Sequence, residues 1–129
     1  MKRILCVDDH KDICELVVAL LPDYEIFCEH TAIEAVMRAA TFSFDLYLIE
    51  YLLPDADGIF LCEAIRRFDP SVPILLFNGT GLITERQVVE AGAQGLIKKE
   101  TGFPSNLVEE IKRLVSIVFI ATPLAIVIF

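Results

Sequence analysis

Five polar side chains lie where apolar runs of this sequence end. Asp8 and Asp9 follow the first run, Glu50 ends the third, Asn78 ends the fourth, and Lys99 follows the fifth. Carboxylates suit Mg²⁺, and a lysine beside them can hold a phosphoryl group or pair with a carboxylate. Three carboxylates in one place repel one another unless a cation lies between them. Taken singly, each acid is equally consistent with a solvated loop residue or a helix cap, but the whole set indicates a site.

The predicted sheet is organised around the stretch over residues 44–58. Residues 46–49 form an unbroken apolar run, which is typical of a strand buried on both faces. A buried helical segment could show the same run, but Pro54 and the Asp57-Gly58 pair interrupt it too early for a helix. The strand therefore ends near Glu50, at the edge where open α/β sheets bind ligands.

The rest of the chain alternates between short apolar runs and apolar residues at helical spacing. The pattern predicts further strands over 4–7, 25–29, 73–77 and 96–98, and helices over 13–20, 31–40, 58–67, 84–91 and 105–119. Thr31 with Glu34, and Thr84 with Gln87, form capping-box patterns at two helix starts. This alternation predicts an α/β fold with a doubly wound, five-stranded parallel sheet. The motifs of dinucleotide and P-loop sites are absent from the sequence.

The composition sets limits on the class of protein. The chain has 129 residues, which fits one domain, and a formal net charge of −8, which argues against direct nucleic-acid binding. Its four cysteines form no Cys-x-x-Cys pair. We expect them to be small core residues rather than disulfides or metal ligands, in a reduced, cytoplasmic compartment. Asp8 and Asp9 interrupt the first apolar run too early for a signal peptide.

Several segments together resemble the response-regulator receiver domains of two-component signalling, across residues 1 to about 118. The matching pieces are Ile4-Leu5-Cys6-Val7-Asp8-Asp9, Phe44-Asp45-Leu46 through Pro54 and Asp57-Gly58, Pro73-Ile74-Leu75, and Gly-Ala-Gln-Gly-Leu-Ile-Lys-Lys over 92–99. The resemblance implies a flavodoxin-like fold with strand order 2-1-3-4-5. It also implies phosphoryl transfer from a histidine kinase onto an aspartate, with Mg²⁺ held by Asp8, Asp9 and Glu50.

The departures from the family pattern fall on the residues that carry its chemistry. The phosphoacceptor aspartate falls on Glu50, whose extra methylene moves the carboxylate, and an in-line attack can lose ~100-fold from an error of ~1 Å. The hydroxyl residue that follows the phosphoryl group falls on Asn78, with Gly79 beside it where a small residue is usual. The aromatic residue of the switch falls on Leu96. The retained residues are Asp8, Asp9 and Lys99.

These departures predict a pseudo-receiver that is not an enzyme and that acts through partners, either a histidine kinase or another signalling protein. We expect Mg²⁺ to bind weakly, and Glu50 to reach toward Lys99 and mimic part of the charge of an acyl phosphate. The alternative is a working Mg²⁺-dependent phosphoacceptor that a histidine kinase phosphorylates. A haloacid-type phosphatase needs Asp-x-Asp after the first strand, whereas His10 follows Asp9 here.

Residues 119–129 form an apolar tail after the receiver-like domain over 1–118. No charge follows Arg113, and Pro123 is expected to break or kink a helix. A membrane anchor is one reading, although sixteen helical residues from Leu114 span only ~24 Å of a ~30 Å hydrocarbon core. A truncated or misread C-terminus is another. We favour a tail that covers an apolar patch on this subunit or a neighbour, most simply in a homodimer through the last helix and the tail.

Overall fold

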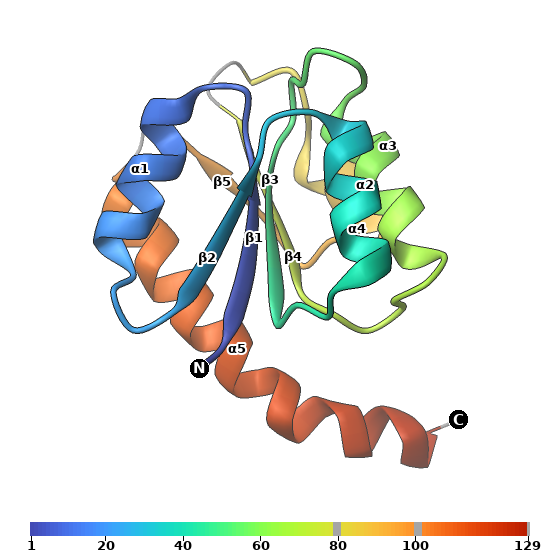
Figure 1. Cartoon of the computed structure of the whole chain (residues 1–129). Coiled ribbons are helices and arrows are strands. Elements are labelled where there is room, and N and C mark those ends of the chain that lie inside the picture. The colour runs from blue at the N-terminus through green and yellow to red at the C-terminus, as the bar shows by residue number, and fades with distance from the viewer. Residues whose placement is uncertain (79–80, 100–101, 129) are drawn as a thin grey trace.

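The computed structural model describes residues 1–78, 81–99 and 102–128, with side chains described up to Ser116. Within these ranges strands and helices alternate in the predicted order (Figure 1). The elements are β1 (Arg3–Val7), α1 (Lys11–Leu20), β2 (Glu25–Glu29), α2 (Ala32–Thr41), β3 (Leu46–Glu50), α3 (Gly58–Arg66), β4 (Ile74–Asn78), α4 (Glu85–Glu90), β5 (Gly95–Lys98) and α5 (Phe103–Ile128).

All strand pairs of the sheet are parallel, and the strand order is β2-β1-β3-β4-β5. This confirms the predicted α/β, doubly wound, flavodoxin-like fold. The register pairs Val7 with Ile49, Glu50 with Phe77, and Asn78 with Lys98. The carboxyl ends of β1, β3, β4 and β5 therefore lie at one edge of the sheet, as the sequence predicted.

Helices cover both faces of the sheet. Figure 1 shows α1 and α5 on one face and α2, α3 and α4 on the other. Each face has its own apolar cluster, and every residue of β3 is buried. Alternate residues of β3 pack into opposite clusters, with Tyr47 and Ile49 on one face and Leu46 and Leu48 on the other. Burial on both faces explains why the run over 46–49 shows no polar alternation.

The two predicted capping boxes differ in the structure. Thr84 and Gln87 form the reciprocal box: the Thr84 amide donates to Gln87 Oε1 at 2.9 Å, and the Gln87 amide donates to Thr84 Oγ1 at 3.2 Å. Thr31 Oγ1 accepts from the Glu34 amide at 3.2 Å, but the Thr31 hydroxyl donates to the Glu34 carboxylate at 2.8 Å. In the Thr31–Glu34 box, the expected bond from the Thr31 amide to the Glu34 side chain is therefore replaced by a contact between the two side chains.

The last helix is longer than predicted. The sequence predicted a helix over 105–119, whereas α5 runs from Phe103 to Ile128 and includes Pro123. Pro104 lies in the first turn, where a missing N–H costs nothing. Pro123 removes one hydrogen bond without preventing the turns on either side from forming. Figure 1 shows α5 passing the amino-terminal edge of the sheet and extending beyond it, at the end opposite to the carboxyl ends of the strands. In the described part of the chain, no helix meets the length and hydropathy needed to cross a membrane.

Candidate functional site

Backbone hydrogen bonds place the predicted site residues at the carboxyl edge. Asp8 follows β1 directly, and its amide donates to the carbonyl of Glu29 at 3.1 Å. Lys99 follows β5 directly, and its amide donates to the carbonyl of Asn78 at 3.3 Å. The sheet ladder thus continues for one residue beyond β1 and β5, which holds both side chains beside the ends of their neighbouring strands.

Lys99 forms ion pairs with two buried carboxylates. Its Nζ lies 2.6 Å from Glu50 Oε1 and 3.6 Å from Asp8 Oδ2. The side chains of Asp8 and Glu50 are 0% and 9% exposed, and that of Lys99 is 23% exposed. The Lys99 ammonium also lies 4.9 Å from the centroid of the Phe77 ring. The predicted approach of Glu50 to Lys99 is therefore present, and one cation offsets the charge of two acids.

The second oxygen of Glu50 also has a partner. Glu50 Oε2 accepts a hydrogen bond of 2.6 Å from the amide of the next residue, Tyr51. A carboxylate held by an ammonium and an amide has a defined position and a stabilised negative charge. Both carboxylate oxygens of Glu50 are thus engaged by donors of the protein itself.

The loop after Glu50 is packed tightly through Gly58. The Gly58 amide donates to the Tyr51 carbonyl at 2.6 Å. A Cβ on Gly58 would lie 2.6 Å from Leu76 Cδ2 and 2.9 Å from the carbonyl oxygen of Glu50. Only glycine fits here without a shift of the neighbouring atoms. The sequence marked Asp57-Gly58 as a turn, but nothing in the turn pattern showed that Gly58 touches the backbone of Glu50.

Asp8, Asp9 and His10 bring their ligand atoms together. His10 Nδ1 lies 3.2 Å from an oxygen of each aspartate, and the His10 amide donates to Asp8 Oδ1 at 2.8 Å. In the parts of the chain that the structure describes, these residues form the one group of three or more metal-ligating side chains whose ligand atoms lie within 4.8 Å of one another. His10 is exposed at the start of α1, and it joins the two predicted aspartates.

The acidic group fits a divalent cation in its chemistry. Asp8 Oδ2 is buried and accepts no hydrogen bond from the described residues, although Lys99 lies nearby. A buried carboxylate oxygen without a hydrogen bond is costly, and a hard cation such as Mg²⁺ would satisfy it. Asp8 and Asp9 are suited to hold such an ion. Glu50, the third predicted ligand, is drawn toward Lys99 and Tyr51, and its role as a ligand stays a prediction.

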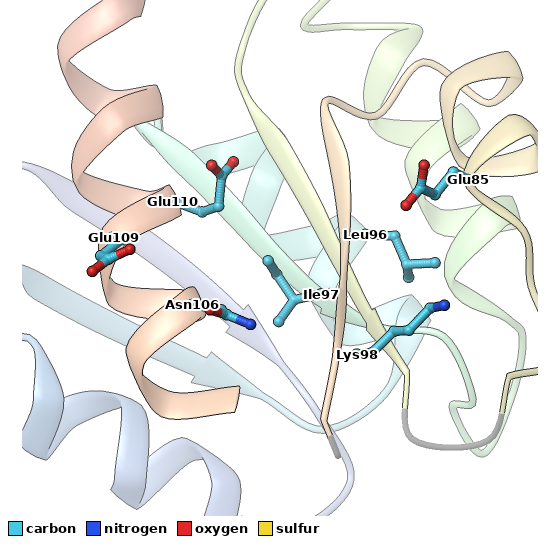
Figure 2. Close-up of a pocket in the computed structure, with 7 residues that line it drawn as sticks. All are labelled: Glu85, Leu96, Ile97, Lys98, Asn106, Glu109 and Glu110. Carbon is cyan, nitrogen blue, oxygen red and sulfur yellow. The ribbon is translucent and has the colours of Figure 1, made fainter. Parts of the chain in front are cut away.

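The other predicted residues lie in three different settings. Asn78 is the last residue of β4, is buried, and pairs across the sheet with Lys98. Gly79 lies outside the described residues. Leu96 lines a hollow of about 490 Å³ between α4, β5 and α5. Figure 2 shows Leu96 and Lys98 on the side of β5 that faces α4, and Ile97 on the side that faces α5. The structure thus gathers Asp8, Asp9, Glu50 and Lys99 but leaves Leu96 at a separate hollow.

Comparison with known sequences gives a consistent match. Residues 4–112 match the family model of the response regulator receiver domain. The chain is 31% identical over 107 residues to the chemotaxis protein CheY of Halobacterium salinarum, covering 81% of this chain and 89% of that protein. It is 37% identical over 76 residues to protein RcaC of Microchaete diplosiphon, covering 58% of this chain and 12% of that protein. The match to the transcriptional regulatory protein ZraR of Klebsiella oxytoca covers 23% of that protein, so the chain spans less than a quarter of these two larger relatives.

Solved structures show the same similarity in three dimensions. A CheY-like response regulator receiver domain protein from Methanospirillum hungatei superimposes with a TM-score of 0.84 at 30% identity, covering 92% of this chain and 96% of that one. The chemotaxis response regulator CheY4 of Vibrio cholerae gives a TM-score of 0.80 at 27% identity, covering 88% and 98% of the two chains. The similarity therefore extends over nearly the whole of both structures.

Proposed function

The chain belongs to the response regulator receiver domains of two-component signalling, and from that premise we propose that it is an atypical receiver. It acts mainly as a protein-interaction module and not as an enzyme. Receivers resembling it accept a phosphoryl group on an aspartate, and that position is Glu50 here. Its partners are a histidine kinase or another signalling protein, and it does not bind nucleic acid directly.

The arrangement of Glu50 is the observation that carries this proposal. Oε1 of Glu50 contacts the Lys99 ammonium and Oε2 accepts from the Tyr51 amide, both at 2.6 Å. In a phosphorylated receiver, the lysine at this position would hold the phosphoryl group. Here the lysine already has a negative partner that is one methylene longer than aspartate. We therefore propose that the pair mimics part of an acyl phosphate and keeps the domain in one signalling state.

Phosphoryl transfer to Glu50 would need a different side-chain position. The attacking oxygen has to lie in line with the leaving group, and both oxygens of Glu50 are held by other donors. Mg²⁺, held by Asp8 and Asp9, would offset the charge on a phosphoryl group. The carboxamide of Asn78 lacks the hydroxyl that receivers resembling this one use to follow that group.

A working phosphoacceptor is the second candidate, and the retained acidic group favours it. Asp8 and Asp9 lie together, and Lys99 lies beside Asp8. With Mg²⁺ bound, Lys99 could leave Glu50 and take up a phosphoryl group instead. This alternative makes the chain a self-phosphorylating switch and differs from the first in one measurable product, an acyl phosphate.

Mass spectrometry after incubation with acetyl phosphate and Mg²⁺ separates the two candidates. We expect the intact chain to gain no phosphoryl group. Glu50→Gln is the matched control, because it keeps the size of the side chain and removes the nucleophilic oxygen. A phosphoryl adduct on the natural chain that is missing from Glu50→Gln would establish the second candidate in place of the first.

A second experiment tests whether the switch itself is altered. We expect Glu50→Asp alone not to restore switching, because Asn78 and Leu96 remain as they are. Beryllofluoride, a phosphoryl mimic, is added to this variant, and amide chemical shifts are followed along β5. Small shifts confined to the acidic edge support the proposal. A large chemical-shift change at Leu96, as in a fully activated receiver, would contradict the proposal.

A further inference from the structure

Three cysteine thiols converge on the face of the sheet that α1 covers. Cys6 of β1 and Cys28 of β2 are register partners on neighbouring strands, so their side chains leave the same face of the sheet. Cys14 lies on α1 above them, and its thiol donates to Cys6 Sγ at 3.7 Å. Cys6 and Cys14 belong to the apolar cluster that α1 and α5 form with this face of the sheet, and the partly buried Cys28 packs against that cluster. Residues that are scattered in the sequence thus form one thiol group in space.

The three cysteines differ in how far they are exposed to solvent. Cys6 is fully buried and Cys14 is 4% exposed, whereas Cys28 is only partly buried. Cys14 and Cys28 both line a cavity of about 370 Å³ that opens to solvent. The other lining residues are Lys11, Glu15, Val18 and His30. A small reagent that enters this cavity meets Cys28, the more exposed of its two lining cysteines.

The surroundings of Cys28 favour its thiolate, whereas the pKa of Cys6 and of Cys14 is raised. The neighbouring thiols of Cys14 and Cys6 lower the pKa of Cys28 despite its partial burial, and His30 acts in the same direction. The contact with Cys28 raises the pKa of Cys14. A thiolate is the reactive form of cysteine toward oxidants. The thiol with the best access is therefore also the better nucleophile.

We propose that Cys28 and Cys14 form a dithiol site that a hydroperoxide oxidises to an intramolecular disulfide. The Cys28 thiolate attacks the hydroxyl oxygen of the hydroperoxide, so that an S–O bond forms as the O–O bond breaks and the other oxygen leaves as hydroxide or alkoxide. The Cys14 sulfur then attacks the sulfenic sulfur of Cys28, the S–S bond forms, and hydroxide leaves with the Cys14 proton as water. Two thiols lose two electrons in all, and the peroxide gains them.

The positions of the elements favour this pair over the other combinations. β1 lies between β2 and β3 in the sheet, so Cys6 cannot move without disturbing two strand ladders. By contrast, β2 is an edge strand and α1 lies outside the sheet, so the elements that carry Cys14 and Cys28 are less constrained by strand pairing than β1. Within the described residues, the thiols and His30 do not form a group with closely spaced metal-ligand atoms. Oxidation therefore suits the site better than metal binding.

Cys62 provides an internal control. It lies in the apolar cluster on the opposite face, is fully buried, and its thiol donates to the carbonyl of Ala91 at 3.3 Å. The one other cysteine outside the proposed pair, Cys6, belongs to the apolar cluster on the other face of the sheet and is not available to pair with Cys62. The proposal therefore predicts that Cys62 keeps its thiol under conditions that oxidise Cys28 and Cys14.

The first test uses the natural full-length chain, folded and reduced. A limiting amount of a maleimide is added, and peptide mapping ranks the labelled cysteines. We expect Cys28 to be labelled first, faster than Cys62 by roughly tenfold or more, because it combines access with thiolate character. Equal labelling of Cys28 and Cys62 would overturn the proposal, and this result does not depend on any variant folding.

The second test is oxidation with hydrogen peroxide. We expect two of the four thiols to be lost, the mass to fall by two hydrogen atoms, and mapping to find a Cys14–Cys28 bridge that dithiothreitol reverses. Cys28→Ser should abolish the bridge, and Cys62→Ser should leave it unchanged; circular dichroism checks that both fold. A Cys6–Cys14 bridge, a bridge between two chains, or sulfinic acid on Cys28 without a bridge would each contradict the assigned pair.

Discussion

Lys99 and Glu50, which are 49 residues apart in the sequence, form an ion pair with 2.6 Å between Nζ and Oε1. Asp8 Oδ2 lies 3.6 Å from the same ammonium. The pair joins the end of β3 to the residue after β5, across the intervening strand β4. Its position at the carboxyl edge makes it both a structural link and the feature that any phosphoryl group or cation at this site has to displace or accommodate.

Lys99→Met should destabilise the fold. The change leaves two buried carboxylates without their shared cation, and breaking a buried pair from one side costs about 3–5 kcal/mol. Because Lys99 is 23% exposed, we expect a loss of roughly 2–4 kcal/mol in the free energy of unfolding, measured by urea denaturation. Lys98→Met, at an exposed neighbour, is the matched control. Equal stability of the two variants would show that the ion pair contributes little.

Mg²⁺ should bind weakly to the natural chain and more tightly to Lys99→Met. Asp8 and Asp9 supply the ligands, while the Lys99 ammonium competes for the negative charge of Asp8. Calorimetric titration to millimolar Mg²⁺ should give a measurable heat that Asp9→Ala abolishes. No heat from the natural chain, or a lower affinity in Lys99→Met, would count against a cation site at this edge.

Gly58→Ala should destabilise the loop that follows Glu50. The added Cβ would overlap Leu76 Cδ2 and the carbonyl oxygen of Glu50, and overpacking typically costs about 1–3 kcal/mol. Gly95→Ala is a milder control, because its Cβ would meet only Leu75 Cδ2, at 3.3 Å. Thermal unfolding of the two variants compares the positions directly. We expect the larger drop in Tm for Gly58→Ala, together with changed amide shifts at Glu50 and Tyr51.

Asp55 should stabilise α2 at neutral pH through its charge. Its carboxylate accepts from the amides of Ala32 at 2.7 Å and Ile33 at 2.9 Å, and these bonds lower the pKa of Asp55 below its ordinary value of 3.8. A lowered pKa in the folded state stabilises the fold above the unfolded pKa, and this contribution disappears as the pH falls through the folded pKa. Asp55→Asn should therefore cost less than about 1 kcal/mol at pH 7, since the group is exposed.

The pH profile distinguishes this effect from a general loss of packing. The difference in unfolding free energy between the natural chain and Asp55→Asn should shrink as the pH falls below 3.8. Thr31→Ala removes the neighbouring cap without removing a charge. The difference in unfolding free energy between the natural chain and this variant should not follow the titration of Asp55. A constant difference for Asp55→Asn across the acidic range would mean that the charge plays no part.

Removal of the residues after Ser116 should shift the chain toward the monomer. Residues 117–129 include six Ile or Val, two Phe and no charge, and each large apolar side chain forgoes ~1.5–3 kcal/mol if left in water. Analytical ultracentrifugation measures the association state. The far-ultraviolet signal should fall by the share of the lost helix, while amide shifts of the sheet stay unchanged.

Two results with the natural full-length chain would contradict the dimer hypothesis for the tail. If it sediments as a monomer without detergent and exchanges the amide protons of residues 117–128 freely, the dimer hypothesis is wrong. If it needs detergent or lipid to stay in solution, the membrane reading replaces the dimer. Because α5 leaves the sheet at the end opposite to the carboxyl end of β3, truncation should not alter Mg²⁺ binding in either case (Figure 1).

The fold class followed from local patterns in the sequence. Each of these patterns depends on the environment of neighbouring residues. They are the apolar run over 46–49, the helical spacing between the runs, and the turn residues at Pro54 and Asp57-Gly58. Backbone periodicity and burial are coupled over a few residues, so these patterns survive in a single sequence. A parallel sheet requires the carboxyl ends of its strands to lie at one edge, so the sequence pattern alone places Asp8, Glu50, Asn78 and Lys99 at that edge.

The tertiary structure alone decided which of these side chains touch. Three sets of contacts join residues from separate elements. They are the bonds to the two Glu50 oxygens, the close packing that restricts position 58 to glycine, and the Asp55 cap on α2. The same holds for the meeting of Cys6, Cys14 and Cys28 beneath α1. Such contacts depend on strand register, helix placement and side-chain torsions, which no periodic pattern encodes. The length of α5 was also missed, because Pro123 weakens a helix locally without deciding whether the turns beyond it form.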